Sequence, residues 1–349
     1  MTDPIRIGIV GAGDNTKRKH LPGFRNIDGV EIAGVVNRTP ESTNAVAAEF
    51  EIPKQYATWQ ELVADDEIDA VLIGTWPNLH CEITCAALKA GKHVLSEARM
   101  ARDLAEADQM LAASKEYPEL VAQVVPSPFG LKCGPMMNAL INDHFLGDLR
   151  EIVVLGANDL FWDYSKPIHW RQDSELSGKH ILSLGILYET LVRWAPEAVR
   201  VFAQTELFEP NRPDPENSLF QDVSVPDSVQ IVTEHKGGAR GMFHISGVIL
   251  FGPGLQIHLY GSRGTIKIEF NGDEERILSG RAGDSELKEV SIPEEEQGAW
   301  TVEEDFIAAI RGEKKVELND FATAMKYMEF IEAVDSSAAQ NAPVDVPGK

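Results

Sequence analysis

Cysteine is scarce in this chain, and long apolar runs are missing. Its 349 residues contain three cysteines, Cys81, Cys85 and Cys133, and so low and odd a number argues against a disulfide framework and favours a reducing compartment. No cluster of His and Cys has the spacing of a zinc site, so no metal is expected. No apolar stretch approaches the ~20 residues of a membrane span, and the opening Met-Thr-Asp-Pro carries no signal peptide. We therefore expect a cytoplasmic protein that does not bind membranes.

Positive charge is also in short supply. The chain has 32 Lys and Arg against 55 Asp and Glu, a formal net charge of −23, and such a surface repels phosphate backbones. Nucleic acid is therefore not an expected partner. Hydrophobic residues make up 43% of the chain and charged residues 25%, which is the ordinary globular range. The length predicts about two domains, each large enough for its own core.

A glycine-rich turn follows the first apolar segment. Residues Ile5–Val10 read as a buried strand that runs directly into Gly11-Ala-Gly13. Gly11 permits the tight turn, and Gly13 has no side chain to keep the backbone away from a pyrophosphate at the start of the next helix. Thr16 stands where this motif has its third small residue, so a plain tight turn is the alternative interpretation. A second strand at Val30–Val36 favours the dinucleotide site.

The first third of the chain alternates strand and helix, which predicts an α/β fold with a doubly wound parallel sheet over residues 1–125. The expected strands are Ile5–Val10, Val30–Val36, Ala70–Gly74, His93–Ser96 and Leu120–Val124. The expected helices are Lys17–Ile27, Glu41–Phe50, Trp59–Ala64, His80–Ala90 and Leu104–Lys115. Ligands of such sheets bind beyond the C-terminal strand ends. Those ends are Gly11–Asn15, Asn37–Thr39, Thr75–Asn78 and Glu97–Ala101.

Pro126-Ser127-Pro128 predicts a domain junction, after which residues 126–349 form a second, α+β domain. Its longer, alternating strands suit a largely antiparallel sheet with one face open to a partner. The expected strands are Val199–Thr205, Val229–His235, Ala239–Gly247, Leu255–Tyr260 and Thr265–Phe270. The expected helices are Pro135–Asn142, Ile181–Trp194, Val302–Arg311 and Phe321–Ala333, and Pro210–Asn217 is an expected loop.

Several motifs, in this order, resemble the Gfo/Idh/MocA oxidoreductases. They are Gly8–Gly13 followed by His20–Phe24, then Gly74–His80, Ala90–Leu95, Tyr260–Ile266 and Asp305–Ile310. The resemblance implies an N-terminal Rossmann domain, a C-terminal domain with an open sheet, NAD or NADP as cofactor, and a sugar, polyol or related hydroxy or carbonyl substrate. It also implies a homodimer or homotetramer formed through the C-terminal sheet.

The strand ends and the resemblance together predict the cofactor site. Its residues are Gly11, Gly13, Asp14, Asn15, Asn37, Arg38, Thr75, Trp76, Pro77, Asn78, His80, Glu97 and Ala98. NAD enzymes tend to offer a carboxylate to the ribose after the second strand, where this chain has Asn37-Arg38-Thr39. Arg38 can pair with a 2′-phosphate and stack on adenine, which favours NADP. Alternatively, Arg38 is a solvated loop residue and Asn37 serves NAD.

The expected catalytic groups of the family are missing. Where the family has Glu-Lys-Pro, this chain reads Glu97-Ala98-Arg99, so the lysine that helps to move the proton is absent. Where the family has an Asp and a His four residues apart on a helix, this chain has Ser183 and Leu187. Proton transfer therefore needs a different set of groups.

His180 is one candidate replacement, since positions 180, 183 and 187 share one face of the expected helix. Ser183 and Tyr188 are further candidates for handling the hydroxyl proton, and Lys179 lies beside His180. Arg99 stays protonated, so it can orient a substrate but cannot act as a base. The alternative for His180 is a capping or solvent-facing role at the start of the helix.

Aromatic and polar side chains gather before that helix, and they suit a sugar-like substrate, although packing between domains is an equal alternative. They are Trp162, Tyr164, Trp170 and Arg171. The sequence thus predicts an NAD(P)-dependent oxidoreductase with a non-standard acid–base set. Two alternatives stay open: an enzyme that uses bound cofactor without net redox (lyase, epimerase or glycoside cleavage), and an inactive nucleotide-binding regulatory protein.

Overall fold

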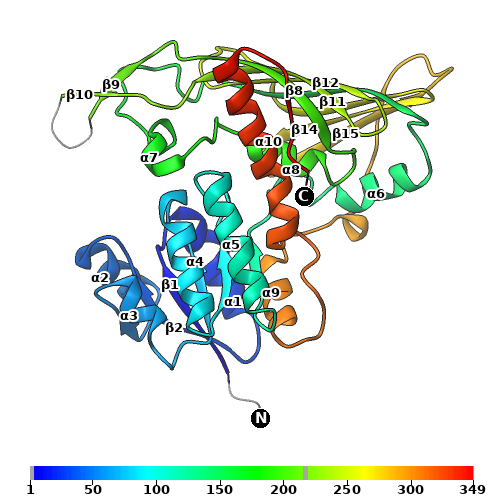
Figure 1. The fold of residues 1–349 in the computed structure, drawn as a ribbon. Coiled ribbons are helices and arrows are strands. Elements are labelled where there is room, and N and C mark those ends of the chain that lie inside the picture. Colours follow the sequence, from blue (N-terminus) through cyan, green and yellow to red (C-terminus); the bar gives the residue numbers. More distant parts are fainter. Residues whose placement is uncertain (1–3, 215–218, 349) are drawn as a thin grey trace. The chain divides into compact units, whose positions relative to one another are not determined.

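The chain divides into two compact units in the computed structural model, which describes residues 4–214 and 219–348 (Figure 1). The first unit comprises residues 1–126 and 301–325, and the second comprises 127–300 and 326–349. The chain first passes from the first unit to the second between residues 126 and 127, one residue from the predicted boundary between 125 and 126. Residues 301–325 return to the first unit, whereas the sequence predicted one second domain over residues 126–349.

Within the described residues of the first unit, six parallel strands form one sheet in the order β3-β2-β1-β4-β5-β6. The strand order reverses between β1 and β4, which is the point where doubly wound sheets bind ligands. The strands are β1 (Ile5–Val10), β2 (Val30–Val36), β3 (Lys54–Gln55), β4 (Ala70–Ile73), β5 (His93–Ser96) and β6 (Ala122–Val124). The predicted parallel sheet is confirmed, and β3 is a short addition to it.

The helices of the first unit agree with the prediction except at the first one. They are α1 (Leu21–Arg25), α2 (Pro40–Glu49), α3 (Trp59–Val63), α4 (His80–Lys89), α5 (Leu104–Glu116) and α9 (Val302–Ile310). The helix predicted over Lys17–Ile27 is present as one continuous helical segment that ends at Arg25, and its first part, Thr16–His20, is a π-helical turn that leads directly into α1. The hydroxyl of Thr16 donates to the Gly11 carbonyl at 3.3 Å, so the residue in the third motif position is tied to the glycine-rich turn itself.

The second unit contains a nine-stranded sheet, counted over the described residues, in the order β16-β15-β14-β13-β7-β12-β11-β8-β17. β7 and β12 are parallel, and the other neighbouring strands in that part of the chain are antiparallel. The strands are β7 (Leu149–Ala157), β8 (Ala198–Glu206), β11 (Ser228–His235), β12 (Arg240–Ser246), β13 (Gly254–Gly261), β14 (Gly264–Asn271), β15 (Glu274–Arg281), β16 (Lys288–Glu289) and β17 (Val344–Asp345). The largely antiparallel sheet is confirmed.

One face of this sheet is buried and the other is not. Along β11, Val229 and Ile231 are buried, whereas Gln230 and Val232 between them are exposed. A separate hairpin pairs β9 (Asn211–Pro213) with β10 (Phe220–Asp222). The expected loop over 210–217 is therefore partly strand, and its residues 215–217 lie outside the described residues.

The helices of this unit are α6 (Gly134–Asn142), α7 (Ser174–Ser177), α8 (Leu184–Leu191) and the part of α10 (Phe321–Gln340) that follows Met325. Tyr188 of α8 stacks on Phe330 of α10, with ring centroids 3.8 Å apart and planes 2° apart. Across residues 4–214 and 219–348, no helix combines the length and the apolar character that crossing a bilayer requires. The expected cytoplasmic location stays a prediction.

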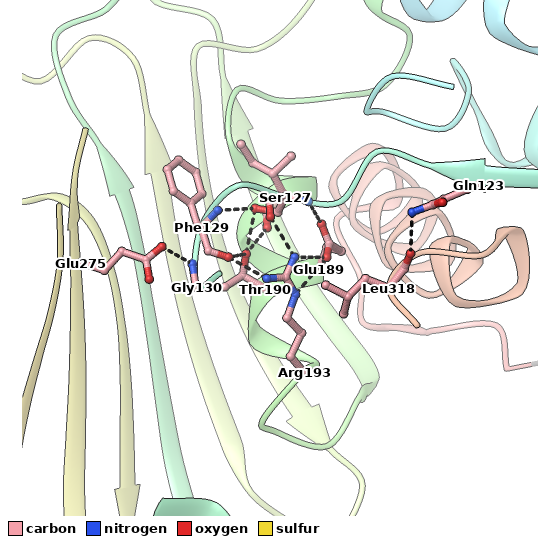
Figure 2. A network of polar contacts seen from close by, with 10 residues as sticks. Gln123, Ser127, Phe129, Gly130, Glu189, Thr190, Arg193, Glu275 and Leu318 are labelled. Atoms are coloured by element: carbon pink, nitrogen blue, oxygen red, sulfur yellow. Dashed lines mark hydrogen bonds and ion pairs between the residues drawn. The ribbon is translucent and has the colours of Figure 1, made fainter. Parts of the chain in front are cut away.

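The segment that follows the first crossing is fixed to α8 by a buried polar network (Figure 2). Glu189 accepts from the backbone N–H of Ser127, and the guanidinium of Arg193 donates to the carbonyls of Ser127 at 2.9 Å and Phe129 at 2.8 Å. Arg193 also forms an ion pair with Glu189. Because Glu189 of α8 and Arg193 just after it hold the backbone N–H and carbonyl groups of this segment, the position of α8 in this unit is tightly specified.

Candidate active site

The turns after β1 and β4 meet at two glycines, Gly11 and Gly74, where an added side chain would collide with backbone. Gly11 has a φ of +83°, and a Cβ there would lie 2.9 Å from the backbone of Gly74 and Thr75. A Cβ on Gly74 would lie 2.2 Å from the carbonyl oxygen of Gly11. The turns after β1 and β4 therefore abut, and Gly11 is required by the fold itself.

Gly13 is different. It is exposed, and a Cβ there would meet only the Gly74 carbonyl oxygen, at 3.8 Å. Packing within the protein does not demand glycine at this position, whereas the close approach of a ligand to the backbone does. An exposed glycine at the carboxyl edge of the sheet, beside the switch point between β1 and β4, fits a dinucleotide pyrophosphate.

Asn37 stabilises the glycine-rich turn through hydrogen bonds to the backbone. Its Oδ1 accepts from the N–H of Ala12 at 2.7 Å, and its Nδ2 donates to the Ser42 carbonyl at 3.2 Å. The prediction that Asn37 serves the ribose directly is therefore not favoured, since its amide already holds two segments of backbone. Only the bond to the Ser42 carbonyl needs an amide donor, because a carboxylate would accept from the N–H of Ala12 equally well.

Arg38 lies next to Asn37 and is exposed. Its guanidinium carbon lies 5.4 Å from the ring centroid of Trp76, which follows β4. Planar guanidinium and indole groups at this spacing attract each other through a cation–π contact. The turns after β2 and β4 thus present a positive group beside an aromatic plane, a combination suited to an adenosine phosphate.

Glu97 at the end of β5 is the centre of a polar cluster. Its Oε1 accepts from Asn15 of the glycine-rich turn and lies 3.0 Å from Nε2 of His20, while its Oε2 accepts from the N–H of Ala98 at 3.1 Å. His20 is fully buried, and its Nδ1 is bonded to Glu303 of α9. Burial lowers the pKa of His20, but the hydrogen bonds to Glu303 and Glu97 outweigh it and raise the pKa to about 9.

The side chain of His80 holds two turns of the backbone together. Its ring nitrogens lie 2.8 Å from the carbonyl of Arg99 and 3.0 Å from the carbonyl of Thr75, and the side chain is fully buried. Burial lowers its pKa. The buried ring links the turns after β4 and β5, and the contact of His80 with the cofactor stays a prediction.

The other residues of the predicted cofactor site lie at the strand ends, as expected for this sheet. Asp14 is exposed and pairs with Arg18 at 3.3 Å, and Pro77 is buried, whereas Thr75, Asn78 and Ala98 are partly buried. Arg99 is 4% exposed. With alanine at position 98 and Arg99 buried, the cation nearest to Glu97 in this turn is withdrawn from solvent.

The backbone around His180 contradicts the predicted helix face. α7 ends at Ser177 and α8 begins at Leu184, so Ser183 is the residue before the helix and His180 precedes it by four positions. Gly178 has a φ of +70° and Leu182 a φ of +47°, and these conformations interrupt the helix. The argument that positions 180, 183 and 187 share one helical face is therefore wrong. His180 is 1% exposed and Leu187 fully buried.

Two of the proposed acid–base residues have other roles. Tyr188 is 1% exposed, its hydroxyl accepts from the N–H of Ala198 at 2.9 Å, and burial raises its pKa. Lys179 pairs with Glu332 at 2.7 Å and Asp335 at 2.9 Å on α10. Tyr188 is thus a core residue and Lys179 a helix-anchoring one, which contradicts their predicted catalytic roles. Ser183, by contrast, is partly buried beside β7.

The aromatic segment before α7 is exposed at its tip. Trp162 is 51% and Tyr164 61% exposed, while Trp170 is partly buried with the guanidinium carbon of Arg171 4.1 Å from its ring. Arg212, a residue that sequence reasoning missed, holds this segment: it is 1% exposed and donates to the carbonyls of Phe161 and Asp163. The sequence offers no signal for Arg212, because it lies about 50 positions away in a proline-rich stretch.

A six-stranded doubly wound sheet with an exposed glycine at its switch point defines a Rossmann-type dinucleotide-binding unit. Residues 5–124 match the oxidoreductase family with an NAD-binding Rossmann fold, Gfo/Idh/MocA, and residues 136–267 match a C-terminal domain of the same family. The chain belongs to the Gfo/Idh/MocA family, as its motifs predicted.

Relatives of known name support this assignment. The chain is 38% identical over 112 residues to 4-carboxy-2-hydroxymuconate-6-semialdehyde dehydrogenase of Sphingobium sp., a match that covers 32% of this chain and 35% of that enzyme. It is 23% identical over 282 residues to myo-inositol 2-dehydrogenase of Thermotoga maritima, covering 80% of each. The fold matches levoglucosan dehydrogenase in complex with NADH and L-sorbose, with a TM-score of 0.87, 21% identity and coverage of 98% and 99%.

Proposed function

We propose that this protein is an NAD(P)-dependent oxidoreductase that transfers a hydride to or from a sugar, polyol or related hydroxy or carbonyl compound. The observation that carries the proposal is Gly13, an exposed glycine that packing does not require, at the switch point of a doubly wound sheet. The family and the names of its relatives, among them myo-inositol 2-dehydrogenase, support the substrate class.

When bound, the dinucleotide supplies the hydride acceptor or donor. This chain's own residues have to bind it, orient the substrate and move the hydroxyl proton. Tyr188 and Lys179 are removed from that list by their packing and ion pairs. We propose His180 or Ser183 as the group that takes up the hydroxyl proton and Arg99 as the residue that orients the substrate. Of the two candidate acceptors, only the imidazole belongs to a residue type whose ordinary pKa lies near neutrality, as general base catalysis requires.

Arg38 and Trp76 support a preference for NADP over NAD. An exposed guanidinium beside an indole plane suits a 2′-phosphate and the adenine next to it, and a repelling carboxylate is missing. Titration of the protein with NADPH and NADH by fluorescence tests this. We expect Arg38→Ala to weaken NADPH binding about 10-fold and to leave NADH binding nearly unchanged. Arg25→Ala, which removes an exposed arginine from α1 outside the predicted cofactor site, is the matched control.

A panel of sugars and polyols assayed at 340 nm tests the reaction class. Reduction or oxidation of the free cofactor in step with substrate supports the proposal. Turnover of substrate without any change at 340 nm favours instead an enzyme that oxidises its substrate transiently with bound cofactor. Cofactor binding without turnover of any tested compound favours a regulatory nucleotide-binding protein.

We also propose that the protein forms a homodimer or homotetramer through the open face of the second sheet. A row of apolar side chains crosses four neighbouring strands of that face: Phe202, Val232, Met242 and Val153 are paired in register, with Val232 54% and Met242 50% exposed. Contiguous apolar surface of this kind marks association sites. Light scattering of wild type and Met242→Glu tests it, because a charge in the row should shift the assembly to the monomer.

A further inference from the structure

Glu97 presents a carboxylate whose orientation is fixed from several sides. Its Oε1 is bonded to Asn15 and to His20, and its Oε2 accepts from the N–H of Ala98. Its side chain keeps 15% of its surface exposed. Since Glu97 directly follows β5 at the carboxyl edge of the sheet, its remaining acceptor capacity lies in the region where ligands of such sheets bind.

Glu303 and His20 support Glu97 from behind. The His20 imidazole lies fully buried between the two carboxylates, and the Glu303 side chain is 1% exposed. α1 makes room for Glu303 at Gly23, where a Cβ would lie 2.7 Å from the Glu303 carboxylate. Because buried charges are tolerated only when they are paired and hydrogen-bonded, the arrangement favours an imidazolium between two carboxylates.

We propose that His20 and Glu303 are positioning residues for Glu97, which hold its carboxylate ionised and oriented toward the dinucleotide. This inference rests on the proposed function. The side chains of His20 and Glu303 are both buried, so they act through Glu97. The chain Glu303–His20–Glu97–Asn15 joins α9 to the glycine-rich turn, and a change at α9 is therefore transmitted to the cofactor site.

The positioning depends on the charge of His20. The titratable groups hydrogen-bonded to the imidazole are Glu97 from the end of β5 and Glu303 from α9, and the amide of Asn15 lies 3.3 Å from Nε2. Below pH 9 the imidazolium separates the two carboxylates. Above it, two negative charges share one neutral ring, and we expect Glu97 to turn away from its fixed orientation.

The experiment measures dinucleotide affinity from pH 6 to 10 by calorimetry, and the protonation of His20 by ¹⁵N NMR in the cofactor-free protein. Wild type should hold its affinity up to about pH 8 and lose it through pH 9, with the His20 signal titrating over the same range. Glu303→Gln keeps the shape but removes one carboxylate charge. We expect it to move both transitions to lower pH and to weaken binding about 10-fold at pH 8.

Glu304→Gln, an exposed neighbour on the first turn of α9, is the matched control and should behave as wild type. The signal of His20 is assigned by its loss in His20→Gln, and if that variant fails to fold, wild type and Glu303→Gln still decide the question. A His20 that titrates near 6.5, or a Glu303→Gln variant with unchanged affinity and pH profile, overturns the inference alone. Wild type that binds neither NAD nor NADP at any pH overturns the proposed function and the inference together.

Discussion

Replacing Gly13 with alanine tests whether glycine at this position is required for stability of the fold or for binding of a dinucleotide. The added methyl group meets only the Gly74 carbonyl oxygen, at an ordinary van der Waals distance of 3.8 Å, and Gly13 does not have the positive φ of Gly11. We therefore expect the free energy of unfolding to stay within about 1 kcal/mol of wild type. A pyrophosphate seated against this backbone has to move outward by roughly the radius of the methyl group, which should weaken dinucleotide binding about 10- to 100-fold.

The assay pairs a thermal or urea unfolding curve with calorimetric titration of NADP and NAD. The expected result is an unchanged midpoint of unfolding together with the loss in affinity. Equal affinity in Gly13→Ala and wild type would refute the reasoning, since it would mean that no phosphate approaches this turn. A large loss of stability would refute it in another way, by showing that the fold itself needs the glycine.

Three further outcomes follow from the same geometry. Gly11→Ala places a Cβ 2.9 Å from the next turn at a φ of +83°, so unfolding curves should show a loss of about 1–3 kcal/mol or more. Tyr188→Phe keeps the stacked ring but leaves the N–H of Ala198 unpaired, which should cost about 1–2 kcal/mol in unfolding while the pH profile of turnover stays unchanged. The pKa of His20, raised to about 9, predicts that its protonated form contributes about 3 kcal/mol to the free energy of unfolding. This contribution is fully present below pH 6.5 and is lost as the pH rises through 9. Urea unfolding at pH 7 and pH 10 measures the difference, and equal stability at the two pH values would contradict the prediction.

The first unit was predictable because its signals are local. β1, β2 and β5 have the bounds that their apolar runs predicted, and Gly11 stands at the turn where its positive φ is needed. The cluster around His20 was not predictable. Glu303 lies 283 residues away and is indistinguishable in the sequence from the other acids of a helix start, so nothing local marks it as the partner of a buried histidine.

The prediction around His180 failed for a reason that a periodicity argument cannot detect. A helical face over positions 180–187 requires a helical backbone throughout, and no residue type in that range forbids one. The break depends on Leu182, a residue that rarely takes a positive φ and does so here at +47°. A Cβ on Gly247 would lie 3.2 Å from the Leu182 side chain, so Leu182 packs closely on a residue 65 positions away in the sequence. Contacts of this kind are invisible to a periodicity argument, and the start of α8 at Leu184 therefore could not be predicted from local residue types.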